Sequence, residues 1–155
     1  MKNDIIVSII IPYFRKKFFF QKTIKSIINQ SFKKYEIILI YDDYDLQELD
    51  FVKKVLTKVK KKKILINKKN LGAGISRNKG ILASKGKFIA FCDADDIWKK
   101  NKLSLQLSFM KKNNLNFSHT SYSIINQDSK IVGKFIIKKK IDYQNLLASC
   151  DIGLS

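Results

Sequence analysis

The sequence predicts an α/β fold with a mostly parallel central sheet flanked by helices, and two observations lead to this prediction. Short runs of apolar, mostly β-branched residues alternate along the chain with segments whose apolar residues recur every three or four positions, the pattern of strands and helices in turn. The length of 155 residues allows one domain with a hydrophobic core and is too short for two. We therefore expect a single domain over residues 1–155.

The first part of the chain contains two predicted strands, each followed by a predicted helix. Residues 5–11 are nearly all β-branched, as in a parallel strand covered on both faces, and we expect Pro12 to end this strand. Apolar residues within 20–28 recur with helical spacing. Residues 37–41 predict a second buried strand, and apolar residues within 49–59 return to helical spacing.

The next part repeats this alternation. Residues 64–66 predict a third, short strand, and residues 70–74 predict a glycine-containing loop. This loop opens a helix that we expect to end near Ser84. Residues 88–92 predict a fourth strand, and the apolar residues within 103–110 indicate another helix.

The last elements follow a weaker pattern. Residues 117–125 and 130–137 read as the two strands of a hairpin, with the polar residues 126–129 as its turn. No internal repeat and no linker separates these elements from the preceding ones. The order of strands and helices over the main part of the chain is that of an α/β domain.

The charge of the chain is unusual. Lysine and arginine number 31 against 13 aspartates and glutamates, which gives a net charge of +18. Only Arg15 and Arg77 are arginines, whereas nucleic-acid and phosphate sites favour the arginine fork over lysine. A lysine-rich genome explains most of the excess, and an anionic membrane or nucleic acid is the alternative. We expect the lysine run within residues 58–63 to be a solvated helix end.

The cysteines and the apolar N-terminal run indicate in which compartment the protein is located. Cys92 and Cys150 cannot build a disulfide framework, so we expect free thiols in a reducing compartment. Residues 5–14 are too short to cross a bilayer and lack the cleavage site of a signal peptide. These features predict a cytoplasmic protein.

Two acidic clusters follow predicted strands. Five of the 13 acidic residues fall within residues 42–43 and 93–96. In open α/β sheets the ligand lies outside the carboxyl ends of the strands, so both clusters are candidate ligand contacts. Asp42 and Asp43 could accept hydrogen bonds from a nucleobase imide or from ribose hydroxyls, or could begin a turn.

The second cluster contains an Asp-x-Asp pattern. Asp93 and Asp95 could offer hard oxygen ligands to Mg²⁺ or Mn²⁺, with coordination positions left for phosphate oxygens. The alternative is that Asp95 or Asp96 forms the N-cap of a helix that runs through Trp98.

Gly72, Gly74 and Arg77 have part of the spacing of a dinucleotide fingerprint, but a cation replaces its third glycine. Backbone N–H groups at the start of the following helix, together with Arg77, would suit an anion. The alternative is an ordinary loop followed by an arginine that faces solvent.

Taken in order, four segments of the chain resemble the inverting family 2 glycosyltransferases of the GT-A fold. The resemblance covers essentially the whole chain and implies the Rossmann-like GT-A sheet, incomplete at the C-terminus. The segments are Val7-Ser8-Ile9-Ile10-Ile11-Pro12-Tyr13, Tyr35-Glu36-Ile37-Ile38 leading to Asp42-Asp43, Asn70-Leu71-Gly72 with Ser76-Arg77-Asn78-Lys79-Gly80-Ile81, and Gly86-Lys87-Phe88-Ile89-Ala90-Phe91 leading to Asp93-Ala94-Asp95-Asp96.

The resemblance implies a role for particular residues. The base of a nucleotide diphosphate sugar would lie against Pro12 and the ring of Tyr13 or Phe14, and either Asp42 or Asp43 would contact that base, usually uracil. Asp95 would be the direct ligand of Mn²⁺ or Mg²⁺, with Asp93 nearer to the ribose or the metal. The implied donor-binding residues are Pro12, Tyr13, Phe14, Asp42, Asp43, Gly72, Arg77, Asp93 and Ala94.

Two departures from the family pattern stand out. The usual Asp-Asp-Gly-Ser turn is replaced by residues 42–45, which contain no glycine. Residues 151–155 resemble the beginning of the acceptor-binding half, so we expect the acceptor part, and the general base that deprotonates the acceptor, to lie beyond Ser155.

The resemblance therefore implies a metal-dependent, inverting glycosyltransferase. It would move a sugar from a nucleotide diphosphate sugar, a UDP-sugar, to a glycan or lipid-linked acceptor in surface polysaccharide or cell-envelope biosynthesis. We expect peripheral contact with the inner face of the cytoplasmic membrane, and self-association or a partner chain that completes the fold.

Other readings of the sequence remain. One is a catalytically impaired fragment that binds the nucleotide sugar. Another is a basic nucleic-acid-binding protein, against which the scarcity of arginine and the absence of a nucleic-acid motif argue, so we expect no specific nucleic-acid partner. A nucleotidyltransferase would require a glycine-rich loop after the first strand, and residues 13–17 contain no glycine.

Overall fold

The computed structural model describes residues 5–137 of the chain. The chain divides into two compact units, the first ending at Phe109 and the second beginning at Met110. The first unit contains the sheet and the residues predicted to bind a donor, and the second contains a hairpin. Each unit is described by itself.

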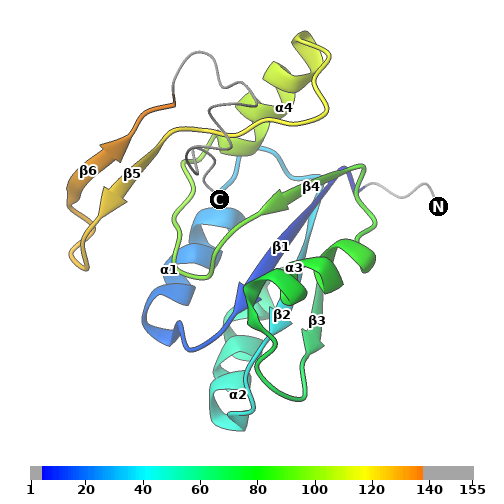
Figure 1. The fold of residues 1–155 in the computed structure, drawn as a ribbon, viewed down its shortest axis with the longest axis vertical. Helices are drawn as coiled ribbons and strands as arrows, with labels where there is room; N and C mark the ends of the chain where they lie inside the picture. The colour runs from blue at the N-terminus through cyan, green and yellow to red at the C-terminus, as the bar shows by residue number, and fades with distance from the viewer. Residues whose placement is uncertain (1–4, 138–155) are drawn as a thin grey trace. The chain divides into compact units, whose positions relative to one another are not determined.

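The first unit is built on a four-stranded parallel sheet, which confirms the predicted α/β fold class. Its strands are β1 (Val7–Tyr13), β2 (Tyr35–Tyr41), β3 (Lys62–Ile66) and β4 (Phe88–Phe91), in the order β3-β2-β1-β4 (Figure 1). Because all four strands run in the same direction, their carboxyl ends lie along one edge of the sheet. We call this the carboxyl edge, and the opposite one the amino edge.

Helices cover both faces of this sheet. Helices α1 (Lys17–Ile28) and α2 (Leu46–Val55), the latter followed by the 3₁₀ turn η1 (Leu56–Lys58), pack on one face. Helix α3 (Gly72–Leu82) lies on the other face, in front of the sheet in Figure 1. Helix α4 (Lys102–Lys112) follows the fourth strand.

The core explains the unbroken apolar runs of the strands. Along β1, Ile9 and Ile11 join the cluster that packs with α1 and α2, whereas Ile10 between them joins the cluster beneath α3. Alternate side chains point to opposite faces of a strand, and helices cover both faces here. Each fully buried isoleucine contributes about 2 kcal/mol of hydrophobic stabilisation.

The prediction that Pro12 ends the first strand is wrong, because β1 continues through it to Tyr13. The carbonyl of Ile10 accepts a hydrogen bond from Cys92 on the β4 side, and the carbonyl of Tyr13 accepts one from Asp42 on the β2 side. Since directions alternate along a strand, the nitrogen of Pro12 faces the β4 side. The pairing of β1 with β4 has ended by then, at Ile10, so the missing N–H of proline costs no ladder hydrogen bond.

Three other boundaries differ from the predicted ones. Helix α3 begins at Gly72, so the glycines expected in a loop lie in its first turn. The helix predicted over 49–59 ends at Val55 and continues only as the 3₁₀ turn η1. The last two residues of the lysine run, Lys62 and Lys63, belong to strand β3 rather than to a helix end, and both are exposed.

The second unit contains the predicted hairpin. Strands β5 (Tyr122–Ile125) and β6 (Ile131–Phe135) pair antiparallel and are shorter than expected. The turn closes where the sequence predicts it, since the amide of Asn126 donates to the carbonyl of Lys130 at 2.9 Å.

Two expectations, free cysteines and the absence of a membrane-spanning segment, concern residues that the structure describes. Cys92 is a free, buried cysteine, and Cys150 lies outside the described residues. Within residues 5–137, no helix has the length and apolar character that crossing a membrane requires. Cytoplasmic location, membrane contact and self-association stay predictions.

Candidate functional site

Three ion pairs connect the loops at the carboxyl edge of the sheet. Each joins an aspartate that follows β2 or β4 to a basic side chain from another segment. The pairs are Arg15 with Asp43 at 3.1 Å, Lys16 with Asp95 at 2.7 Å, and Arg77 with Asp93 at 2.6 Å. The edge that the sequence predicted to bind a ligand therefore carries acids and bases that neutralise one another.

Asp43 is the acidic partner in the first pair. Its carboxylate is 1% exposed and accepts hydrogen bonds from Arg15 Nε at 3.1 Å and from the amide of Tyr44 at 2.8 Å. The guanidinium of Arg15 also lies over the ring of Phe14, 5.0 Å from its centroid. Asp43 raises the pKa of Arg15 by hydrogen bonding and by its charge.

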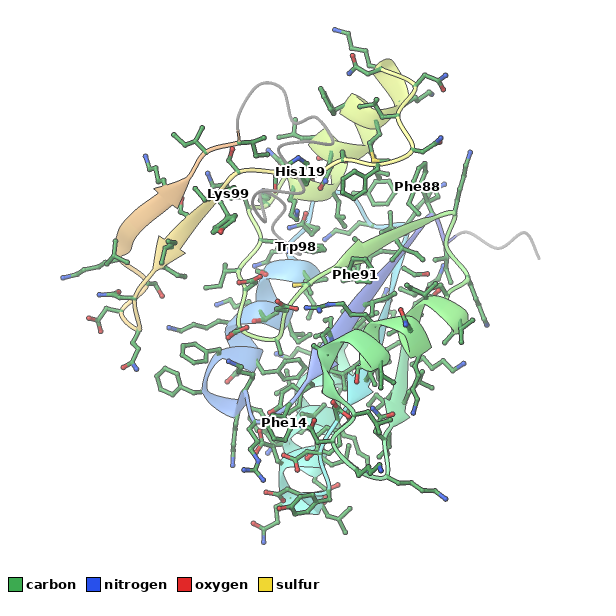
Figure 2. The ribbon with its side chains drawn as sticks, viewed as in Figure 1. Phe14, Phe88, Phe91, Trp98, Lys99 and His119 are labelled. Carbon is green, nitrogen blue, oxygen red and sulfur yellow. The ribbon has the colours of Figure 1, made fainter. Side chains whose placement is uncertain are left out.

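The rings of Tyr13 and Phe14 lie in different environments. The side chain of Tyr13 is completely buried, stacks on Tyr41 at 5.6 Å and donates its hydroxyl to Glu48 at 2.5 Å. Burial, and then the Glu48 carboxylate, raise the pKa of Tyr13. Phe14 is 40% exposed beyond the end of β1 (Figure 2), and Pro12 is half-buried. Of the two rings, that of Phe14 is accessible to a ligand.

Asp42 is held very differently from its neighbour Asp43. One oxygen accepts hydrogen bonds from Asn67 Nδ2 at 2.7 Å and from the amide of Leu71 at 2.8 Å, and the other accepts from the amide of Gly72 at 2.8 Å. Both amides belong to the start of α3, whose N–H groups have no partner within the helix. Asp42 thus supplies the N-cap of α3 from a neighbouring strand.

The conformation of Gly72 fits this arrangement. Its φ of +83° lies in the region that side chains other than glycine rarely adopt. A Cβ at this position would meet no atom within 4 Å. The backbone angle, and not lack of space, is therefore what requires glycine at the first residue of α3.

Arg77 projects from the second turn of α3 to the end of β4. Its Nη2 donates to Asp93 Oδ1 at 2.6 Å, and its side chain is only 15% exposed. Its Nε is buried and has no hydrogen-bond partner in the part of the chain that the structure describes. Arg77 therefore does not face open solvent, and one of its donors remains available.

The loop after β4 places its aspartates in a tight turn. The amide of Asp96 donates to the carbonyl of Asp93 at 3.1 Å, and the buried Ala94 accepts from Thr23 Oγ1 of α1 at 2.9 Å. The alternative that Asp95 or Asp96 caps the following helix is wrong, because α4 begins only at Lys102.

The pKa of Asp96 is shifted by its environment in this turn. Burial, and then the charges of Asp93 and Asp95, raise the pKa of Asp96 to about 6. The carboxylates of this turn repel one another, although Arg77 and Lys16 pair with two of them, and hard carboxylate oxygens suit Mg²⁺ or Mn²⁺. No group of three potential ligands converges within residues 5–137. A cation bound by Asp93 or Asp95 would therefore have to take its other ligands from phosphate or water oxygens.

Three residues of this edge were not selected from the sequence. Arg15 and Lys16 follow β1 directly, and Asn67 follows β3. The rule that identified the aspartates, namely that ligands bind at the carboxyl ends of parallel strands, applies equally to these positions. That rule could have found them.

The sequence is similar to known glycosyltransferases. The profile of the family described as "Glycosyl transferase family 2" matches residues 8–149. Two relatives from Escherichia coli are UDP-Glc:alpha-D-GlcNAc-diphosphoundecaprenol beta-1,3-glucosyltransferases: WfgD, 41% identical over 97% of this chain and 58% of its own length, and WfaP, 34% identical over 97% and 59%. The chain thus spans somewhat more than half the length of these two relatives.

A solved structure has a similar fold. The crystal structure of S. aureus TarS residues 1–349 in complex with UDP-GlcNAc matches with a TM-score of 0.64 and 25% identity. The match covers 71% of this chain and 32% of TarS.

Proposed function

The chain belongs to glycosyl transferase family 2, and from this premise we propose that its carboxyl edge binds a nucleotide diphosphate sugar, a UDP-sugar. We propose further that the whole protein transfers the sugar to a lipid-linked or glycan acceptor in surface polysaccharide biosynthesis. The similarity to the two E. coli glucosyltransferases and to TarS supports this donor and acceptor class.

The observation that carries the proposal is the set of three ion pairs at the carboxyl edge. A nucleotide diphosphate with its cation brings a hydrogen-bond donor on the base, two negative phosphates and a positive metal. Together these groups can bind five members of the three pairs. The base would donate a hydrogen bond to Asp43, the phosphates would contact Lys16 and Arg77, and the metal would bind Asp93 and Asp95. Asp43, Asp93, Asp95, Lys16 and Arg77 would each gain a partner from the ligand, and Arg15, whose side chain is 57% exposed, would be solvated, so no charge is left buried and unpaired.

Among the two neighbouring aspartates, we assign the base contact to Asp43. A ligand could reach it by displacing Arg15, whose side chain is 57% exposed and can be solvated, while the buried carboxylate keeps the amide of Tyr44 and gains the N–H of the base. A ligand that took Asp42 would remove the acceptor of the Leu71 amide, which costs about 1–3 kcal/mol for a group left buried and unpaired. The Gly72 amide would keep only its longer contact with Asn70 Oδ1 at 3.1 Å. Phe14 provides the exposed ring beside Asp43 on which a base can stack.

The metal and the diphosphate would be bound by neighbouring groups. Asp95, with Asp93, would hold Mn²⁺ or Mg²⁺, which when bound neutralises the diphosphate and stabilises it as a leaving group. Lys16 and Arg77 would contact phosphate oxygens directly, the arginine through its forked N–H donors. Thr23 holds the carbonyl of Ala94 and so keeps the turn that carries both aspartates in place.

In the proposed reaction, an acceptor hydroxyl attacks the anomeric carbon of the sugar as the bond to the diphosphate breaks. Attack opposite the leaving group inverts the configuration at that carbon. A carboxylate must take the proton of the hydroxyl, and the resemblance assigns this role to no residue in the chain. The described residues therefore serve donor binding in this proposal.

Calorimetric titration of UDP tests the proposal. We expect the protein to bind UDP in the presence of Mn²⁺, and Asp95→Asn to weaken that binding by at least about tenfold, because the direct metal ligand loses its charge. Asp50→Asn is the matched control, since Asp50 is an exposed aspartate of α2 that pairs with Lys53 at 3.4 Å. Folded protein that binds no UDP with or without Mn²⁺ would contradict the proposal.

A further inference from the structure

We propose that Asp42 is a positioning residue for the donor diphosphate, acting through the start of helix α3 on Arg77 without touching the nucleotide. This inference rests on the proposed function, and it assigns different tasks to two adjacent aspartates. Asp43 would recognise the base, and Asp42 would set the position of the arginine that binds phosphate. The argument follows the contacts from Asp42 along α3 to Arg77.

The first step is the cap itself. Asp42 is 2% exposed, and its two oxygens accept the three hydrogen bonds from Asn67, Leu71 and Gly72. A carboxylate at a helix N-terminus also interacts favourably with the helix dipole. Because β2 carries Asp42 at its carboxyl end, this contact fixes the first turn of α3 against the sheet.

The second step is a contact one turn further along the helix. Asn67, at the end of β3, donates to Ser76 Oγ at 3.2 Å and accepts from Lys79 Nζ at 2.6 Å. The same Asn67 amide nitrogen donates to Asp42. Since Ser76 and Lys79 lie on either side of Arg77 in the sequence, the network fixes the rotation of α3 about its own axis at that position.

The third step is the close approach of α3 to the sheet. A Cβ on Gly80 would lie 2.5 Å from Ile10 Cγ2 and 3.0 Å from Ile40 Cδ1. The helix therefore packs directly on β1 and β2, with no room for even a methyl group between them. Its distance from the sheet is set by this contact, and its sliding along the sheet is opposed by the cap.

These three contacts determine where the guanidinium of Arg77 lies. Its Nη2 donates to Asp93 at 2.6 Å, and its Nε is buried without a partner among the described residues. A charged side chain with little exposure has few alternative positions, so its placement depends on the helix that carries it. Loss of the cap would let the first turns of α3 fray and would move Arg77 away from the diphosphate.

The first test needs no ligand. The chain has two arginines, so their side-chain Nε–H signals in ¹⁵N NMR spectra are two, and Arg15→Lys assigns them. We expect the signal of buried Arg77 to exchange slowly with solvent in the wild type and at least about tenfold faster in Asp42→Asn, as expected for local opening of α3. The Arg15 signal and the amides of β1 and β2 stay unchanged, and Asp50→Asn alters neither arginine.

A second, milder variant covers the case in which Asp42→Asn does not fold. Asn67→Ala removes one donor to Asp42 and both contacts to α3, and it should also speed exchange at Arg77. An exchange rate at Arg77 that stays within about twofold of the wild type in a folded variant would overturn the proposal.

The second test uses binding in the presence of Mg²⁺. We expect Asp42→Asn to weaken UDP about tenfold and uridine less than about twofold, because only UDP carries the diphosphate. In an Arg77→Gln background, the same substitution should change UDP affinity less than about twofold, since its effect passes through Arg77. Equal weakening of uridine and UDP, or full additivity with Arg77→Gln, would overturn the proposal. If the wild type binds no UDP, the proposed function fails, and the exchange rate at Arg77 still decides whether Asp42 positions it.

Discussion

The two edges of the parallel sheet hold their buried carboxylates by different kinds of partner. At the amino edge, Glu36 accepts hydrogen bonds from Ser8 Oγ at 2.7 Å and from the amide of Lys85 at 2.8 Å. At the carboxyl edge, Asp43 is as deeply buried, yet one of its oxygens is occupied by Arg15, a side chain that is mostly exposed. Burial alone therefore does not separate a structural carboxylate from one that is available to a ligand.

The difference lies in what it costs to remove the partner. A backbone amide or a buried hydroxyl that loses its acceptor remains buried and unpaired, at about 1–3 kcal/mol. An exposed arginine that loses its acceptor is hydrated instead, so only the carboxylate needs a new partner. By this criterion Asp42 belongs with Glu36, although it lies beside Asp43 at the carboxyl edge.

The largest effect is expected at the amino edge. A Cβ on Gly86 would lie 2.6 Å from the backbone nitrogen of Ser8, and backbone atoms cannot move aside as a flexible side chain can. We expect Gly86→Ala to lower the free energy of unfolding by about 3 kcal/mol or more. Urea denaturation measures this loss.

Gly74→Ala is the control for that substitution. Its Cβ would meet no atom within 4 Å, and alanine favours a helix over glycine by up to about 1 kcal/mol. We expect unchanged or increased stability. Equal destabilisation by both substitutions would show that the amino edge is not the tightly packed region described above.

The second prediction compares one carboxylate from each edge. Asp43→Asn should weaken UDP binding about tenfold with a small change in stability, because its lost partner, Arg15, is solvated. Glu36→Gln should leave UDP binding unchanged and lower stability by about 1 kcal/mol. Titration calorimetry and urea denaturation of the two variants distinguish these outcomes, and the reverse pattern would refute the assignment of roles.

The third prediction concerns pH. The pKa of Asp96 is raised from 3.8 to about 6, so the folded protein retains this proton at a higher pH than the unfolded chain does. The resulting stabilisation is complete below the ordinary pKa and is lost as the pH rises through about 6. With chelator present, Asp96→Asn should therefore be more stable than the wild type by about 1 kcal/mol at neutral pH, after allowance for solvent screening.

Thermal unfolding of both proteins at several pH values measures this difference. The advantage of the variant should shrink as the pH falls toward the ordinary pKa of aspartate. A difference that does not depend on pH would contradict the raised pKa.

The smallest effect is expected from Arg15. In Arg15→Ala, Asp43 no longer has to release a protein partner before it accepts the base, so UDP affinity should rise by about threefold. The same titration measures it, and Lys53→Ala, which removes a basic partner from an exposed ion pair on α2, is the control. Weaker binding by Arg15→Ala would mean that the arginine itself contacts the nucleotide.

Much of the fold follows from the sequence, because strands β1 and β2 are buried on both faces. The runs at 5–11 and 37–41 are apolar at nearly every position, and the structure places strands there. The end of β1 could not be predicted, since whether Pro12 is tolerated depends on where the neighbouring strand β4 stops. Such a boundary is a property of the sheet and not of the local residues.

The candidate site was predicted in part. The strand-end rule and the family resemblance indicated both acidic clusters and Arg77. Neither could separate Asp42 from Asp43, because adjacent residues of one type differ here in partners that lie far away in the sequence, such as Asn67 for Asp42 and Arg15 for Asp43. For the same reason, no pattern in the sequence showed that Tyr13 is buried while Phe14 is exposed.

The most direct test of the central claim is an NMR titration of the two arginine side chains with UDP and Mg²⁺. If the ligand replaces the protein partners of Asp43 and Asp93, the Nε–H signals of Arg15 and Arg77 will both shift and will saturate at the same UDP concentration. The amides of Leu71 and Gly72, which Asp42 holds, will shift little. Two arginine signals that remain unchanged while UDP binds would contradict the account.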